Sequence, residues 1–115
     1  MKPIGPYSIS REAQGFVFVS GQISLEPDIK AATTQILENI SSILESHKLT
    51  LKDAIKTTVF LTNLDDFAKM NEVYETFFTN PYPARSTIGV CALPKGANIE
   101  IECIAARPPF NPLYD

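Results

Sequence analysis

Two stretches of the chain place hydrophobic residues at the spacing of an amphipathic helix. Hydrophobic residues recur every three to four positions in residues 29–47 and again in residues 66–78. The positions are Ile29, Ala32, Ile36, Ile40, Ile43 and Leu44 in the first stretch, and Phe67, Met70, Tyr74, Phe77 and Phe78 in the second. Asp28 is suited to cap the first helix, and Pro81 cannot continue the second. The pattern predicts two helices that are each hydrophobic on one side only.

Five other stretches have the composition or the alternation of β-strands. They are residues 7–10, 16–23, 55–62, 85–92 and 98–106. In 55–62, one face is expected to carry Ile55, Thr57, Val59 and Leu61, and the other Lys56, Thr58, Phe60 and Thr62. Residues 11–15 are expected to form a turn. Gly21 interrupts the second stretch, which indicates a bulge or a close approach by backbone or ligand.

The order β, β, α, β, α, β, β predicts an α+β fold in one domain, residues 1–115, with both helices covering one face of a sheet. The other face combines charged, β-branched and aromatic side chains. Its expected members are Lys56, Thr58, Phe60, Thr62, Arg85, Thr87, Glu100 and Glu102. We expect copies of the chain to cover this mixed face in a closed homo-oligomer.

The last two strands are expected to pair as a hairpin through a turn at residues 93–97. The residues expected to face the core are Ser86, Ile88 and Val90 in one strand and Ile99, Ile101 and Cys103 in the other. This register puts Arg85 and Glu100 on one face but about 20 Å apart along the hairpin. Either a neighbouring subunit closes that gap or the register differs.

Composition and charge narrow the classes of function. The chain has 115 residues and a net charge of −3, without a basic run, which argues against a broad nucleic-acid footprint. No apolar segment reaches the roughly 18 residues of a membrane span, and the first residues do not resemble a signal peptide, so a cytoplasmic location is expected. Cys91 and Cys103 are interpreted as buried free thiols. With His47 as the only histidine, no metal site is expected.

Arg85 and Glu100 are the candidate chemical groups. Arg85 follows a proline-rich loop, and its planar guanidinium suits a carboxylate bound at two points. Glu100 lies between two isoleucines, where a partly shielded carboxylate can order or activate a water. Together they indicate a small pocket that holds a carboxylate-bearing molecule and brings water to it. The structural alternative is an ion pair of Arg85 with Glu100 or Glu102.

Six segments, in this order along nearly the whole chain, carry a family resemblance. They are Ile4-Gly5-Pro6-Tyr7-Ser8, Val19-Ser20-Gly21-Gln22-Ile23, Ile55-Lys56-Thr57-Thr58-Val59-Phe60-Leu61, Asn71-Glu72-Val73-Tyr74-Glu75-Thr76-Phe77-Phe78, Pro83-Ala84-Arg85-Ser86 and Ile99-Glu100-Ile101-Glu102. With these segments the chain resembles the RidA (YjgF-like) family of reactive-intermediate deaminases.

The resemblance implies a chorismate-mutase-like fold and a homotrimer with clefts between subunits. It also implies hydrolysis of 2-imino acids, such as 2-iminobutanoate and 2-iminopropanoate, to 2-oxo acids and ammonia, without a cofactor. By the same resemblance, Arg85 matches the carboxylate-binding arginine and Glu100 the glutamate that orients water. The residues that match the cleft lining are Tyr7, Ser20, Gly21 and Asn71. From the residues alone, core packing for Tyr7, a strand end for Ser20 and a solvated side chain for Asn71 stay open.

Two departures from the family pattern bear on activity. Thr87 stands where the family usually has a cysteine, at a position that in similar proteins acts largely through its backbone. The connection at residues 25–28 is shorter than the usual loop. Two other classes of function therefore stay open beside the deaminase. One is a non-catalytic trimer that binds a small carboxylate or 2-oxo acid, and the other is an endoribonuclease or translation inhibitor.

Overall fold

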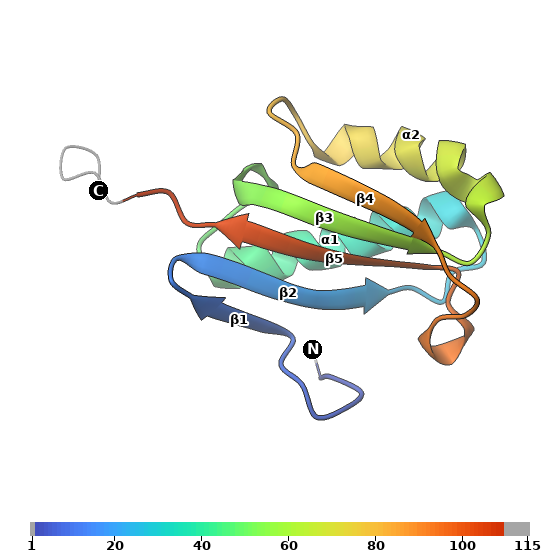
Figure 1. Cartoon of the computed structure of the whole chain (residues 1–115), viewed down its shortest axis with the longest axis horizontal. Coiled ribbons are helices and arrows are strands. Elements are labelled where there is room, and N and C mark those ends of the chain that lie inside the picture. Colours follow the sequence, from blue (N-terminus) through green and yellow to red (C-terminus); the bar gives the residue numbers. More distant parts are fainter. Residues whose placement is uncertain (1, 110–115) are drawn as a thin grey trace.

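Two helices cover one face of a five-stranded sheet in the computed structural model, which describes residues 2–109 (Figure 1). The helices are α1 (Ile29–Ser46) and α2 (Phe67–Phe77). The strands are β1 (Ser10–Ala13), β2 (Phe16–Ile23), β3 (Ala54–Leu61), β4 (Ala84–Gly89) and β5 (Ile99–Ala106). This confirms the predicted α+β fold, a mixed sheet with both helices on one face.

The strand order is β1-β2-β5-β3-β4, so the predicted hairpin between the last two strands is wrong. β4 pairs in parallel with β3, because α2 carries the chain back across the sheet between them. β5 instead pairs antiparallel with both β2 and β3. Alternate β5 residues are buried, which suits a central strand, whereas β4 is largely exposed and forms an edge.

Local capping explains where the helical elements begin. The Asp28 carboxylate accepts a hydrogen bond of 2.9 Å from the backbone N–H of Ala31, which confirms the predicted N-cap of α1. Thr50 and Asp53 form a reciprocal capping box at a single 3-10 turn that leads into β3. Asn63 caps the 3-10 turn Leu64–Asp66, which precedes α2 directly.

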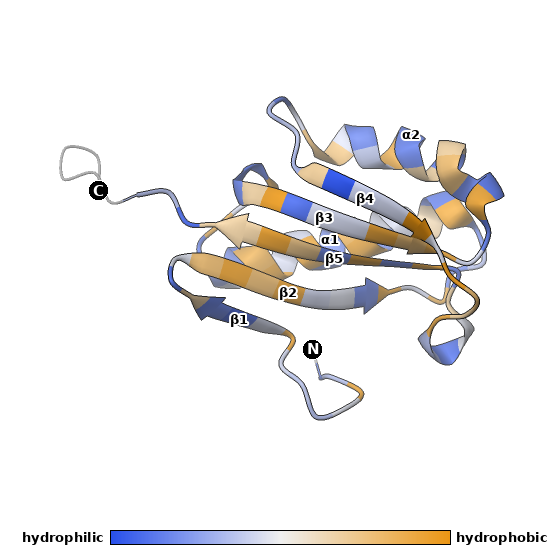
Figure 2. Cartoon of the chain, viewed as in Figure 1, coloured by the Kyte–Doolittle hydropathy of each residue, from blue (hydrophilic) through white to orange (hydrophobic). Residues whose placement is uncertain are grey.

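The alternation along β3 is confirmed except at its start. Thr57, Val59 and Leu61 are buried under the helices, but Ile55 is 44% exposed and Ala54 is buried in its place. The register between β3 and β5 shifts between Ala54 and Lys56, which reverses the faces before that point. Along the strands, hydrophobic and hydrophilic residues are interspersed (Figure 2).

Arg107 ties the end of β5 to β1. Its Nε and Nη2 atoms each donate to the Glu12 carboxylate at 2.8 Å, and Nη2 also donates to the His47 carbonyl oxygen at 2.9 Å. These hydrogen bonds hold the pKa of Glu12 below its ordinary value. The proline-rich stretch that begins at Arg107 would be expected to fray, but these hydrogen bonds show that this expectation is wrong at Arg107. Residues 110–115 lie outside the described part. The predicted turn at residues 11–15 is likewise largely strand, because β1 covers Ser10–Ala13.

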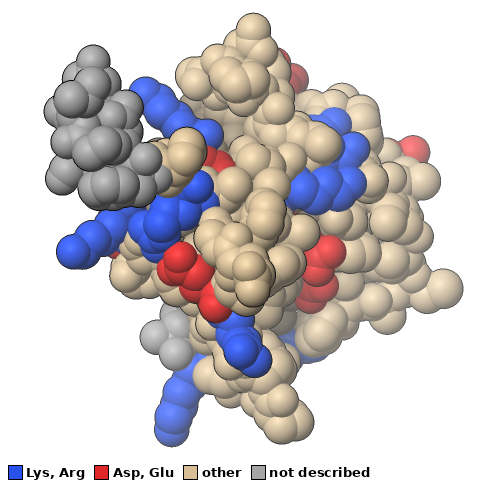
Figure 3. All heavy atoms as spheres, turned by 60° about the vertical axis from the view of Figure 1, so that its left-hand side comes forward, with Lys and Arg blue, Asp and Glu red and all other residues tan. Residues whose placement is uncertain are grey.

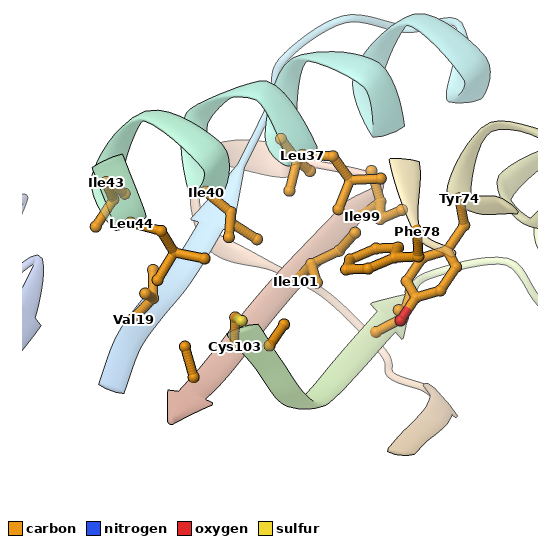
Figure 4. Packing of buried hydrophobic residues seen from close by; sticks show 14 of the residues in the cluster. Val19, Leu37, Ile40, Ile43, Leu44, Tyr74, Phe78, Ile99, Ile101 and Cys103 are labelled. Carbon is orange, nitrogen blue, oxygen red and sulfur yellow. The ribbon is translucent and has the colours of Figure 1, made fainter. Parts of the chain in front are cut away.

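The core lies between the helices and the sheet (Figure 4). Leu37, Ile40 and Leu44 of α1 are fully buried, as is Ile101 of β5. Cys103 is buried among them, and this burial raises the pKa of its thiol to about 12. Cys91 is a free thiol as predicted, but it is exposed rather than buried. Neither helix of the described chain is long and apolar enough to cross a bilayer.

Candidate functional site

Arg85 lies on the helix side of the edge strand β4. It pairs in parallel register with Thr57, which is buried under the helices. Its guanidinium carbon lies 4.7 Å from the centroid of the Tyr74 ring and 5.5 Å from that of Phe67, both on α2. Arg85 makes no ion pair with any residue in the range 2–109. The aromatic rings thus hold the cation while its N–H donors are left for an anion.

A hollow of about 420 Å³ opens beside Arg85. Its lining residues are Asn71, Tyr74, Glu75, Tyr82, Pro83 and Arg85. Asn71 therefore lies beside Arg85. The sequence alone did not indicate Tyr74, Glu75 or Tyr82 as part of this hollow. The sequence did carry one indication that Tyr74 lies beside Asn71, because residues 67, 71 and 74 have the spacing of a single helix face.

Tyr74 is itself fixed by Thr57 across the helix–sheet boundary, where the two hydroxyl oxygens are 2.6 Å apart. We predict that Tyr74→Phe lowers the free energy of unfolding by about 1–2 kcal/mol, because the buried Thr57 hydroxyl loses its partner. The ring under Arg85 is retained, so ligand binding should change little. Urea unfolding monitored by circular dichroism measures the first effect. The matched variant Thr57→Val removes the other hydroxyl, and unchanged stability in Tyr74→Phe would contradict the expected role of this contact.

Glu100 lies on β5, on the opposite face of the sheet. It stands opposite Phe60 of β3 and Ile23 of β2, and its side chain is half-buried. Burial raises its pKa above the ordinary value, and the negative charge of Glu102 adds to this effect. Gly21 is its close neighbour, since a Cβ there would lie 2.6 Å from Glu100 Cδ. The register shift between Val19 and Gln22 confirms the irregularity that Gly21 indicated.

Tyr7 and Ser20 line a second hollow, of about 580 Å³, between the N-terminal segment and the sheet. Phe18 and Glu102 also contribute to it. Tyr7 is 45% exposed, so core packing is wrong for this residue. The Ser20 hydroxyl donates to the carbonyl oxygen of Ile9 at 3.0 Å and holds the segment after Tyr7 against β2.

The candidate residues therefore form two separate groups within one chain. Arg85 and Asn71 lie at the α2 and β4 edge, whereas Tyr7, Ser20 and Glu100 lie on the N-terminal segment, on β2 and on the central strand β5. Arg85 and Glu100 occupy opposite faces, with β3 between their strands, so the expected shared face is wrong. The prediction failed because it took Ser86 and Ile88 as core-facing, whereas both are exposed on the open face of β4. The structural alternative, an ion pair of Arg85 with Glu100 or Glu102 in the same chain, is also wrong.

Thr87 lies two residues beyond Arg85, on the same helix side of β4. It pairs with Val59, and its hydroxyl oxygen is buried without a hydrogen-bond partner in the described part of the chain. Ser86 and Ile88 point the other way and are exposed, which corrects their expected place in the core. No group of three potential metal ligands occurs among residues 2–109.

The arrangement of two helices on a mixed five-stranded sheet is that of the chorismate-mutase-like α+β proteins. The family model described as Endoribonuclease L-PSP matches residues 1–107. A RutC family protein of Pyrococcus horikoshii is 50% identical, with 92% of this chain and 90% of the relative covered. The 2-iminobutanoate/2-iminopropanoate deaminase of Salmonella typhimurium is 44% identical, covering 90% of this chain and 89% of the relative. The crystal structure of E. coli TdcF with bound serine has a TM-score of 0.87 at 41% identity, covering 92% and 91% of the two chains. The chain belongs to the RidA (YjgF-like) family.

Proposed function

We propose that the protein hydrolyses small 2-imino acids to 2-oxo acids and ammonia in a cleft between subunits. Water adds to the C=N carbon, and the C–N bond then breaks to release ammonia, so one water is consumed for each imine. The imine carbon is already electrophilic. The protein needs to hold the substrate carboxylate, orient it and present one water, which requires no redox step.

The observation that carries this proposal is the state of Arg85. Its guanidinium is stacked on Tyr74 without an acidic partner in the described chain and borders a hollow of suitable size. A planar fork with free donors is suited to bind a carboxylate at two points. The deaminase of Salmonella typhimurium and the serine-bound TdcF structure support a small acid as the ligand.

Glu100 is the proposed partner for water. Its half-buried carboxyl has a raised pKa, which brings its proton affinity closer to that needed for proton transfer near neutral pH. As a carboxylate it can accept a proton from the attacking water, and as a carboxylic acid it can deliver that proton to the departing nitrogen. Tyr7 and Ser20 border the second hollow, and in the trimer they would line the same cleft as Glu100.

A homotrimer would bring the two groups together. In a head-to-tail ring, the α2 and β4 edge of each subunit faces the open sheet surface of the next, so a single contact repeats until the ring closes. This open surface carries apolar side chains that suit an interface. They include the exposed Phe18 and Ile88 and the partly buried Phe60 and Ile104.

The direct test is the loss of a 2-imino acid generated in situ from an amino acid. We expect purified protein to accelerate release of the 2-oxo acid and ammonia over the uncatalysed reaction. Light scattering should give a mass of about three chains under the assay conditions. A trimer that binds 2-oxobutanoate without accelerating hydrolysis would leave binding of a 2-oxo acid as its function.

Mixed trimers test whether the cleft is shared. We predict that Arg85→Ala and Glu100→Gln proteins, each with strongly reduced activity alone, regain activity when co-expressed with different tags and purified through both. A three-chain ring that contains both variants has only one junction in the required order, so one cleft in three has an intact Arg85 from one chain and an intact Glu100 from its neighbour. Trimers formed from either variant alone are the control. Inactive mixed trimers would place the whole site within one chain.

Charge gives the nucleic-acid alternative little support. The net charge is −3, and on the end of the molecule seen in Figure 3 the Lys and Arg side chains lie beside Asp and Glu side chains. A nucleic-acid surface needs a basic patch or groove that follows the phosphates.

A further inference from the structure

Glycine at position 21 is not required by the backbone. Among the glycines, positive φ angles occur at Gly15 and Gly96, at +80° and +72°, and Gly21 is not one of them. Gly21 lies inside β2, where a side chain would normally stabilise the strand. The reason for a glycine at this point must therefore lie in its surroundings.

The space that a side chain would need at Gly21 is filled by Glu100. A Cβ atom there would lie 2.6 Å from Glu100 Cδ, 2.7 Å from Oε2 and 3.0 Å from Cγ. Carbon atoms prefer separations of about 3.5–4.0 Å, so the methyl group and the carboxyl group cannot share this space. The irregular stretch of β2 around Gly21 is further held by Gln22, whose Nε2 donates to the carbonyl oxygen of Ser20 at 3.0 Å.

We propose that Gly21 is a positioning residue for Glu100, because the missing side chain fixes where the carboxylate lies on the sheet. The catalytic consequence rests on the proposed function, but the positioning does not. The atoms that a methyl group would meet are at the flexible end of the Glu100 side chain. Gly21→Ala can therefore fold with the β2 backbone in place and the carboxylate displaced toward solvent.

Within one chain, few charges lie around Glu100. In the proposed trimer, Arg85 of the neighbouring subunit adds a positive charge in both proteins compared, so a difference between their titrations reports the position of the carboxylate. Glu102 is on the same strand, β2 contains no titratable side chain, and Lys56 of β3 donates to Ser86 on β4 at 2.8 Å. Burial is the larger cause of the raised pKa of Glu100, ahead of Glu102. Displacement toward solvent should therefore lower this pKa toward its ordinary value in Gly21→Ala.

The test compares Gly21→Ala with the unsubstituted protein by carboxyl-carbon NMR titration and by imine hydrolysis. We expect a lower Glu100 pKa, an acid limb of the kcat profile displaced in the same direction, and kcat reduced about 100-fold with KM nearly unchanged. Gly89→Ala is the matched control, because a Cβ there meets only the Leu64 side chain, at 3.1–3.4 Å. It should change neither the titration nor the rate.

The outcomes separate the positioning from the function. An unchanged Glu100 titration in Gly21→Ala overturns the inference, even if activity falls, because the methyl group would then obstruct the cleft directly. A shifted titration in a protein that never hydrolyses imines supports the positioning and overturns the proposed function. A crystal structure of Gly21→Ala with the Glu100 carboxylate in its original place would also overturn the inference.

Discussion

Arg85→Ala should reduce kcat/KM for 2-imino acid hydrolysis by about 100- to 10,000-fold. Each hydrogen bond from a guanidinium to a carboxylate contributes about 1.5–3 kcal/mol, and the variant loses both arms of the fork. Because the carboxylate is bound before and during the reaction, KM should rise, and lost orientation should lower kcat as well. Steady-state kinetics with an imine generated in situ measures both parameters, and calorimetry with 2-oxobutanoate measures binding.

Arg85→Lys is the matched variant for this prediction. It keeps the positive charge but loses the planar fork and much of the stacking on Tyr74. Its activity should therefore lie between that of the unsubstituted protein and that of Arg85→Ala. Arg85 is on an edge strand without an ion pair in the described chain, so the stability of both variants should fall by no more than about 1 kcal/mol. Full turnover by Arg85→Ala would remove Arg85 from the mechanism.

Glu100→Gln should lower kcat by about 100- to 10,000-fold while 2-oxobutanoate still binds. The amide keeps the shape of the side chain but cannot exchange a proton with the attacking water. In the unsubstituted protein, the rate should fall as the pH drops through the raised pKa of Glu100, because the base becomes protonated. The residual rate of Glu100→Gln should not show this fall at low pH. If the fall persists in the variant, it must come from the protonation of another group.

Stability provides the control for Glu100→Gln. Because its pKa is raised on folding, the folded protein binds this proton more tightly than the unfolded chain. The contribution of Glu100 to the free energy of unfolding therefore falls as the pH rises from the ordinary pKa to the raised one. At pH 7 the glutamine variant should be at least as stable as the unsubstituted protein, so that a loss of activity cannot be attributed to unfolding.

The helices and strands could be predicted from the sequence more fully than the way in which the strands pair. Hydrophobic spacing located α1 and α2, and alternation assigned the buried face of most of β3, because both depend on local geometry. The hairpin failed because strand pairing depends on the rest of the sheet. β5 has enough buried positions for the centre, and the crossover through α2 commits β4 to β3.

The sequence indicated candidate residues but not their arrangement. Sequence motifs indicated Arg85 and Glu100 as candidates, and Gly21 indicated a close approach that the structure assigns to the Glu100 side chain. The same reasoning put Arg85 on the wrong face, because it took the hydrophobic Ile88 as core-facing and side chains alternate along a strand. It also missed Tyr74 as the support of Arg85, because a tyrosine in a hydrophobic stripe has no feature that separates it from the core.

The central place of β5 has a consequence for synthesis of the chain. β2 and β3 both pair with a strand that the ribosome makes after every other strand of the sheet. Until residues 99–106 emerge, β2 and β3 each have one unpaired edge, and such edges can associate with other chains. The nascent chain should therefore depend on chaperones until its last strand is released, and pulse proteolysis of stalled chains should show protection only after β5 has left the exit tunnel.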